Sequence, residues 1–281
     1  MGSLIGFLKR FRPYGNRFTE FAYGLFIVCL GCGLAAGISW TIVALASFLP
    51  TWAGLLIEGL LLSLTISLRG LDRAAHEVQS ALEGLNLSEA RRLLSWHLVS
   101  RDTSSLNESQ ISAAAIESVA ENASDGMIAP LFFYLLGGLP AAFAYRFANT
   151  ADSMLGYHDA EREWLGKFPA RFDDVLNFVP ARLTGLFIVL SAPFCGASLT
   201  KAWNIMWRDS RKTASPNAGV PMSAMAGALG VELEKVDHYR LGQGLCLASV
   251  RDLPRARRLL HVSVWMAMLT FTAWSFYVHS R

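Results

Sequence analysis

Long stretches without charge dominate the pattern of hydrophobic and polar positions. The first runs from Phe21 to Ile57, and a helix that spans a bilayer needs about 20 apolar residues. It therefore predicts one transmembrane helix over Phe21–Leu49 and the start of a second, which follows a turn at Pro50-Thr51 and ends near Leu68. A cleaved signal peptide fits this stretch poorly, because the apolar core of a signal peptide has only about 7–15 residues.

Three further charge-free stretches follow, at Gly126–Tyr145, Leu183–Thr200 and Leu259–Ser280. The first two contain glycine and proline, which predicts helices that are broken or re-entrant, as membranes tolerate where protein or a cavity covers the backbone. The predicted fold is an all-α, polytopic integral membrane protein with about three to five membrane-embedded helices, some of them broken or re-entrant.

The polar stretches also indicate helices. Leu71, Ala74 and Val78 recur at helical spacing. Asn86 and Asn107 are each followed three residues later by Glu or Gln, which is the pattern of a capping box. They predict helices that end near Val99 and Ala123, and no segment shows a convincing strand pattern.

These elements predict one membrane-embedded domain over the whole chain, 1–281. Its parts are an amphipathic N-terminal segment at 1–20, two transmembrane helices at 21–68, a motif-bearing catalytic region at 69–258 with embedded segments near 126–145 and 183–200, and a C-terminal transmembrane helix at 259–281.

Composition agrees with a membrane protein. Of 281 residues 53% are hydrophobic and only 17% are charged, whereas soluble domains carry about 25% charged residues. The net charge of +3 is too small to indicate a nucleic-acid partner. Four cysteines in a chain of this length do not indicate a disulfide framework.

Basic residues set the expected orientation. Lys9, Arg10 and Arg12 precede the first transmembrane stretch, so the N-terminus is expected in the cytoplasm. Because 69–125, 146–182 and 201–258 are all rich in Arg or Lys, simple threading would put one of them outside. Broken or re-entrant segments would keep all three at the cytoplasmic face; the alternative is that one loop is periplasmic.

An acidic helix face is the first candidate for chemistry. Glu117 and Glu121 stand four residues apart and so share one face of the predicted helix, and Asn122 and Asp125 follow. A solvated acidic face explains the pair as well. However, Asp125 directly precedes a charge-free stretch, where an ionised carboxylate is costly without a partner, and this favours a cation or an arginine beside it.

Two oxygen-rich sets follow. Asn149, Thr150, Asp152 and Ser153 form a set suited to Mg²⁺ held together with phosphate oxygens, although an N-cap explains it equally well. The second set runs from Arg171 through Asp173, Asp174 and Asn177 to Arg182; its carboxylates fit a divalent ion and its arginines fit phosphate or carboxylate. An interfacial ion-pair cluster is the alternative.

A turn of small residues over Ser215–Gly219, next to Arg211 and Lys212, is the last candidate. Such a turn can present backbone N–H groups to an anion, although a simple turn is the commoner explanation and the spacing of a P-loop is absent. Taken together, these sets indicate a site for Mg²⁺ and phosphate at a cytoplasmic membrane surface.

The same residues resemble the adenosylcobinamide-phosphate synthase family of cobalamin biosynthesis, CobD/CbiB, over about 70–245. Two departures stand out, the absence of a His-Pro-Val element near the start and Ser100 in place of the usual glycine. The matching segments are Arg101–Thr103, Glu117–Asn122, Asp125-Gly126, Ala129–Phe132, Tyr145-Arg146, Asn149–Met154, Ala170–Arg182, Ser215–Pro221, Ala226–Val231 and Tyr239–Gly242.

The resemblance implies an ATP- and Mg²⁺-dependent ligase of the bacterial inner membrane with its catalytic face in the cytoplasm. It would join (R)-1-amino-2-propanol, or its O-phosphate, to the propionate carboxylate of adenosylcobyric acid. It also implies membrane lipid and other cobalamin-biosynthesis proteins as partners.

Roles for individual residues follow from the resemblance only. The catalytic candidates are Glu117, Glu121, Asp125 and Asp174, and the metal candidates are Asp125, Asp152, Asp173 and Asp174. The candidates for binding substrate or ATP are Arg101, Asp102, Asn122, Arg146, Asn149, Arg171, Asn177, Arg182, Lys212, Ser215 and Asn217.

Two alternatives remain open at the level of sequence. A Mg²⁺-dependent prenyl-diphosphate transferase also uses acidic helices at a membrane cavity, but normally has two separated Asp motifs within long helices. A non-catalytic signalling protein similar to AmpE would share the architecture without needing the Asp, Asn and Arg motifs.

Overall fold

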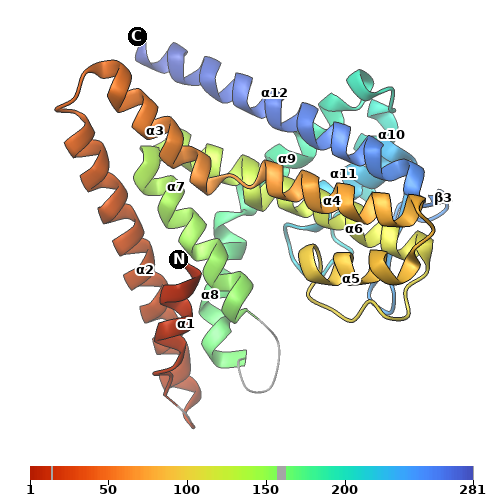
Figure 1. The fold of residues 1–281 in the computed structure, drawn as a ribbon, viewed down its shortest axis with the longest axis horizontal. Helices are drawn as coiled ribbons and strands as arrows, with labels where there is room; N and C mark the ends of the chain where they lie inside the picture. Colours follow the sequence, from red (N-terminus) through yellow and green to blue (C-terminus); the bar gives the residue numbers. More distant parts are fainter. Residues whose placement is uncertain (14, 157–162, 281) are drawn as a thin grey trace. The chain divides into compact units, whose positions relative to one another are not determined.

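A computed structural model describes residues 1–13, 15–156 and 163–280. The chain divides into two compact units, Met1–Ile66 with Ala129–Asn177, and Ser67–Ile128 with Phe178–Arg281. Each unit is described by itself. Helices make up most of both, which confirms the predicted fold class (Figure 1).

The first unit is built from helices α1 (Gly2–Lys9), α2 (Arg17–Ala46), α3 (Thr51–Thr65), α7 (Ala129–Leu155) and α8 (Glu163–Leu176). Helix α2 packs along α7 and α8 (Figure 1).

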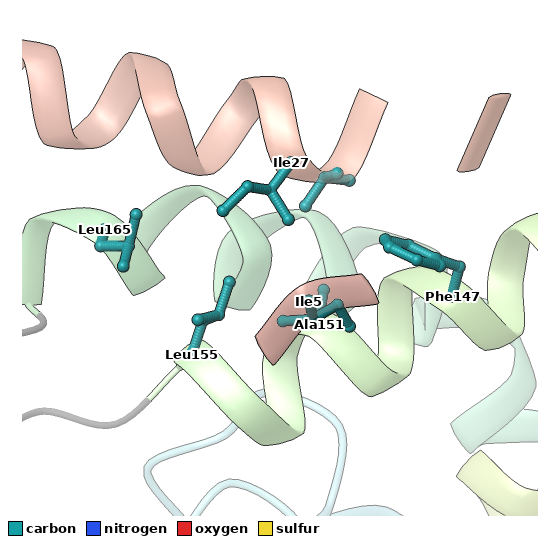
Figure 2. Packing of buried hydrophobic residues seen from close by; sticks show 7 residues of the cluster. Ile5, Ile27, Phe147, Ala151, Leu155 and Leu165 are labelled. Atoms are coloured by element: carbon teal, nitrogen blue, oxygen red, sulfur yellow. The ribbon is translucent and has the colours of Figure 1, made fainter. Parts of the chain in front are cut away.

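A small apolar core joins four of these helices. Figure 2 shows Ile5 of α1, Ile27 of α2, Phe147 and Leu155 of α7 and Leu165 of α8 facing one another. The predicted segment 1–20 thus contains a short helix with one side chain, Ile5, fully buried in this core. Burial of several large apolar side chains contributes roughly 1.5–3 kcal/mol each.

Helix α7 is broken at Gly137-Gly138, where both residues leave helical geometry and Gly138 has a φ of +62°. The rings of Phe133 and Tyr145, on either side of the break, stack with centroids 4.9 Å apart. Twelve residues of continuous helix would separate them by about 18 Å, so the chain folds back at the glycines. The predicted break in the stretch Gly126–Tyr145 is confirmed.

The second unit contains most of the polar sequence. Its helices are α4 (Leu68–Glu83), α5 (Leu87–His97), α6 (Glu108–Ala123), the π-helical turn η1 (Ser124–Ile128), α9 (Phe178–Ser191), η2 (Pro193–Cys195), α10 (Leu199–Asp209), α11 (Gly219–Leu229), η3 (Val250–Asp252) and α12 (Leu253–His279).

Helix α6 is the centre of this unit, because it contacts α4, α11, α12 and the sheet. It starts as predicted, with Asn107 and Gln110 forming a capping box, and runs to Ala123. Asn86 likewise caps α5, which ends at His97 instead of near Val99. Buried alanines along α6, such as Ala114 and Ala120, let neighbouring elements approach closely.

A small sheet corrects the expectation that no segment forms strands. Strands β1 (Val231–Lys235), β2 (Tyr239–Leu241) and β3 (Cys246–Leu247) lie in the order β2-β1-β3. β1 pairs with β2 antiparallel and with β3 parallel. The strands are too short to give a period-2 signal, although Val231 and Leu233 are buried while Glu232 and Glu234 are only partly so.

The predicted multi-pass character is confirmed by four stretches long and apolar enough to cross a membrane among the described residues: Arg17–Ala46, Thr51–Glu83, Glu108–Leu155 and Val250–Val278. Glu163–Leu176 with Phe178–Ser191 gives a fifth, bent one. The last helix begins at Leu253, earlier than predicted, because Pro254 starts it; Arg281, the predicted end of that segment, lies outside the described residues.

Candidate functional site

A buried polar network in the first unit joins three of the predicted site residues. The Nδ2 groups of Asn149 and Asn177 donate to the two carboxylate oxygens of Asp173, at 3.3 and 2.8 Å. The hydroxyl of Tyr145 donates to Oδ1 of Asn177 at 2.8 Å. All four side chains are at least nine-tenths buried, so this network fixes the carboxylate of Asp173 tightly.

Further predicted residues surround this network. Arg146 donates to Oδ1 of Asn149 at 3.2 Å. Asp152 and Asp174 are electrostatic neighbours of Asp173, and Arg171 approaches Asp174 at 3.9 Å. The motif around Asn149 on α7 and the motif around Asp173 on α8 therefore lie together, because these two helices pack against each other.

The donor set of this cluster fits Mg²⁺. Carboxylate and amide oxygens are the ligands that Mg²⁺ prefers, and it is usually held by one or two carboxylates together with substrate phosphates. Asp173 is a buried acid beside two further acidic side chains, Asp152 and Asp174, and a cation would favour the ionised form of such a group. Among the described residues, no group of three or more His, Cys, Asp or Glu is placed to hold a metal ion.

In the second unit, Glu117 is the most buried acid of the predicted set, with 6% of its surface exposed. Its Oε1 has no hydrogen-bond partner in the described part of the chain. The Tyr239 hydroxyl lies within hydrogen-bonding reach of the carboxylate, and Arg101, Glu121 and Lys235 are its charged neighbours. Burial, followed by the negative charges of Glu117 and Glu121, raises the pKa of Tyr239, so its hydroxyl keeps its proton.

The rest of this acidic face continues along α6 into the π-helical turn. Asn122 donates back to the carbonyl of Ser118 at 2.9 Å. Asp125 lies in the turn η1, next to Gly126, where a Cβ would collide with the hydroxyl of Ser67. π-Helical turns occur often at functional sites. Glu121 is exposed, and Asp125 is partly buried.

Asp102 has a local role in the structure. It accepts from the backbone N–H and the hydroxyl of Ser104, both at 2.9 Å. These hydrogen bonds lower the pKa of Asp102, and they shape the loop that carries Arg101.

Arg182, Ser215 and Asn217 come together in the second unit. Arg182 donates to Oδ1 of Asn217 at 2.7 Å and to the carbonyl of Pro216 at 3.2 Å. The hydroxyl of Ser215 accepts from the N–H groups of Asn217 and Ala218. These two N–H groups thus point at Ser215, and the guanidinium of Arg182 supplies the positive charge at this turn.

Lys212 forms an ion pair inside the protein. Its Nζ lies 2.7 Å from Oδ1 of Asp209, whose side chain is fully buried. Asp209 also pairs with Arg208 at 2.8 Å and accepts from the N–H of Gly242 at 2.7 Å. Although burial opposes ionisation, the hydrogen bonds from Arg208, Lys212 and Gly242 lower the pKa of Asp209 to about 2. This clamp fastens the turn after α10 to strand β2.

Sequence reasoning missed Tyr145, Lys235, Tyr239 and Asp209 as participants in these clusters. Tyr145 stood in a matching motif, but only the fold-back of α7 and its bond to Asn177 give it a role. Tyr239 and Lys235 join the cluster because the hairpin of β1 and β2 packs on α6. No periodicity in the sequence connects them with Glu117, which lies more than a hundred residues earlier.

Comparison with known proteins gives consistent matches. A family model described as "CobD/Cbib protein" matches residues 1–267. The chain is 43% identical over 245 residues to "Cobalamin biosynthesis protein CobD" of Dehalococcoides mccartyi (strain CBDB1), covering 87% of this chain and 79% of that protein. It is 40% identical over 284 residues to "Cobalamin biosynthesis protein CbiB" of Salmonella choleraesuis (strain SC-B67), covering 97% and 88%.

A third protein is similar as well. "Probable cobalamin biosynthesis protein CobD" of Methanothermobacter thermautotrophicus (strain ATCC 29096 / DSM 1053 / JCM 10044 / NBRC 100330 / Delta H) is 46% identical over 222 residues, which cover 76% of this chain and 74% of that protein. No solved structure matches the chain.

Proposed function

The chain belongs to the CobD/CbiB family, the adenosylcobinamide-phosphate synthase family of cobalamin biosynthesis, and on that premise we propose that it forms an amide bond at the expense of ATP. The acid is the propionate side chain of adenosylcobyric acid, and the amine is (R)-1-amino-2-propanol or its O-phosphate. The product is adenosylcobinamide or its phosphate. This membership in a family of biosynthetic enzymes favours the ligase over the signalling protein and the prenyl-diphosphate transferase.

The chemistry requires an activated acid, because a carboxylate and an amine do not condense unaided in water. Transfer of the γ-phosphoryl group of ATP to the carboxylate gives an acyl phosphate. The amine then attacks the acyl carbon, phosphate leaves, and the ammonium proton passes to a base. Such a transfer depends on positioning and on charge neutralisation.

The buried network around Asp173 is the observation that carries the proposed use of ATP and Mg²⁺. Hydrogen bonds from Asn149 and Asn177 hold the carboxylate of Asp173 in one orientation. Asp152 and Asp174 add negative charge beside it. When bound, Mg²⁺ would neutralise the charge of the nucleotide phosphates. Asn149 and Asn177 orient Asp173, and Arg146 and Arg171 lie at the edge of the cluster to bind phosphate.

Residues of the second unit have complementary proposed roles. Glu117 accepts the proton of the amine as general base, and Glu121 and Asp125 extend the acidic face. Arg101, Arg182 and Asn217 bind phosphate or the corrinoid carboxylates. Because Lys212 is held by Asp209, its role in binding is indirect, through the placement of the turn at Ser215.

We further propose the inner membrane of a bacterium as the location, with the catalytic residues at the cytoplasmic face. The several long apolar helices support a multi-pass protein, and the basic N-terminal residues support this orientation. Corrinoid, amine and membrane lipid are then the partners, together with other proteins of cobalamin biosynthesis, and nucleic acid is not among them.

Cysteine labelling in right-side-out vesicles tests the orientation. Ser105 and Ser153 are exposed, and cysteine at either position, in a background without the four native cysteines, should react only after the vesicles are opened. Labelling of one position from outside and of the other from inside would show that the two motif regions face opposite sides, which the proposal forbids.

The direct test of function is reconstitution. Purified protein is incubated with adenosylcobyric acid, aminopropanol phosphate, ATP and Mg²⁺, and corrinoid mass is measured. The expected gain equals the amine minus one water, with release of ADP and phosphate. If circular dichroism shows that the protein is folded and neither amine gives a change in corrinoid mass, the proposed reaction is refuted.

A further inference from the structure

A cavity of about 280 Å³ lies at the turn that joins α2 and α3. The two helices diverge from this turn (Figure 1). Three residues of the cavity wall, Ala46, Ser47 and Gly54, have small side chains or none. A Cβ added to Gly54 would lie 3.4 Å from the carbonyl oxygen of Ala46, which is ordinary van der Waals contact. The helices thus meet at the turn, and small residues leave the space beside it unfilled.

Glu58 is the acidic side chain in the wall of this cavity, and the other described residues of the wall are apolar or carry a hydroxyl. Oε1 of Glu58 accepts a hydrogen bond from the hydroxyl of Tyr134 on α7 at 2.8 Å. Within the described part of the chain, no basic side chain forms an ion pair with Glu58. An ionisable side chain in an apolar membrane segment is costly and marks a candidate binding site. The cavity therefore offers negative charge to a cationic occupant.

The length of α2 places this cavity at the level of the lipid headgroups. About 20 residues cross the hydrocarbon core, and a count from Phe21, the first residue of the charge-free stretch, ends at Trp40. Trp40 is 64% exposed, and tryptophan is enriched where a membrane meets water. The part of α2 that lines the cavity begins at Val43, beyond Trp40. An occupant is therefore bound among headgroups, on the membrane side opposite the N-terminus.

A phospholipid with a primary ammonium headgroup fits these features. Its ammonium has three N–H donors and a positive charge, which complement the carboxylate of Glu58. Ligand pockets measure about 300–1,000 Å³, so this cavity has room for a headgroup and not for acyl chains. Exposed apolar side chains next to it, such as Leu45 and Leu55, continue the surface along which acyl chains would lie.

We propose that the α2–α3 hairpin binds phosphatidylethanolamine, with the ammonium on Glu58 and the acyl chains along the exposed apolar faces of the two helices. Tyr134 is a positioning residue, because it donates to Oε1 and leaves Oε2 for the ammonium. The inference adds a defined headgroup and a site to the membrane lipid proposed above. It rests on the proposed membrane location and is independent of the proposed reaction.

Native mass spectrometry of the full chain in detergent tests the site, because it gives a Kd for each bound lipid. Phosphatidylethanolamine, phosphatidylcholine and phosphatidylglycerol with identical acyl chains are added in turn to delipidated protein. The choline headgroup has no N–H donor and the glycerol headgroup has no positive charge, so phosphatidylethanolamine should bind about 10-fold more tightly than either. Equal affinity of the parent for the three lipids would overturn the proposal.

Glu58→Gln tests the acid. It should weaken binding of phosphatidylethanolamine about 10- to 100-fold, the loss expected for one hydrogen bond to a charged group, and should remove the preference for this lipid. Glu108→Gln on α6, at an exposed glutamate, is the matched control and should bind all three lipids as the parent does. Binding of phosphatidylethanolamine by Glu58→Gln with the Kd of the parent would contradict the proposal.

Gly54→Leu tests the cavity while Glu58 is retained. Leucine favours a helix more than glycine does, so the helical circular dichroism should stay unchanged. Because the new side chain fills the space beside the turn, binding of phosphatidylethanolamine should weaken about 10-fold or more. The Kd of the parent in this variant would show that the lipid lies elsewhere.

Two further outcomes identify other occupants. Displacement of the lipid by an equal concentration of ethanolamine would show that the acyl chains contribute nothing, and would overturn the lipid assignment. A lipid-free dimer of the parent that Glu58→Gln converts to a monomer would assign the hairpin to a second copy of the chain instead. None of these measurements uses the ligase reaction, so a failure of the proposed reaction and a failure of the lipid site are distinguishable.

Discussion

The bond between Tyr145 and Asn177 allows a quantitative test of the network around Asp173. Both side chains are buried, with 1% and 2% of their surface exposed, and the bond is 2.8 Å long. Asn177 also donates to the Asp173 carboxylate at 2.8 Å. Tyr145→Phe, Asn177→Ala and the double variant form a double-mutant cycle.

The expected losses in the free energy of unfolding follow from the hydrogen bonds that each substitution removes. Tyr145→Phe leaves Oδ1 of Asn177 buried and unpaired, which costs about 1–2 kcal/mol of the free energy of unfolding. Asn177→Ala removes the hydrogen bonds that Asn177 makes to Asp173 and to Tyr145, which costs about 3–5 kcal/mol. The double variant should lose about 3–5 kcal/mol, less than the sum by about 1–2 kcal/mol, because both single changes remove the same Tyr145–Asn177 bond and the sum counts it twice.

Denaturant unfolding of the purified protein in detergent, followed by circular dichroism at the helical band, measures these values. Tyr277→Phe on α12, where the tyrosine is half exposed, is the matched control and should change stability by less than about 0.5 kcal/mol. Activity at limiting Mg²⁺ should fall more for Asn177→Ala than for Tyr145→Phe. Strict additivity of the two changes would refute the reasoning, since it would mean that the bond contributes no coupling.

Three further outcomes are expected. Asp152→Ala and Asp174→Ala should each abolish turnover at limiting Mg²⁺ while the helical circular dichroism stays unchanged, and near-normal turnover of either would show that its carboxylate is structural. Gly138→Ala should lower the stability measured by denaturant unfolding by about 1–3 kcal/mol, because a φ of +62° strains a residue with a Cβ; unchanged stability would contradict the fold-back at this residue. Asp209, with a pKa near 2 when folded against 3.8 as the ordinary value, should contribute about 2 kcal/mol that is fully present above about pH 5 and lost as the pH falls through 2. Asp209→Asn should flatten this acid limb of the stability profile, and an identical limb in the variant would argue against the clamp.

The sequence by itself determined the helices and their membrane character. Charge-free stretches of about 20 residues have few alternatives to a helix in a membrane, and the capping box at Asn107 marked the start of α6 because its bonds are local. The break in α7 was readable for the same reason, since Gly137 and Gly138 act on their own backbone. The carboxylate and amide motifs of the first unit were also readable, because Asn149 and Asp173 lie in short, dense runs of polar residues.

The tertiary structure decided which of these residues meet. Tyr145 reaches Asn177 only because α7 and α8 pack together, and Tyr239 and Lys235 reach Glu117 only because a hairpin of very short strands packs on α6. Lys212 is predicted from the sequence to bind substrate or ATP, and the structure adds that it pairs with a buried aspartate three residues earlier. Such pairings depend on contacts between elements distant in the chain and on burial, and a local pattern of residues records neither.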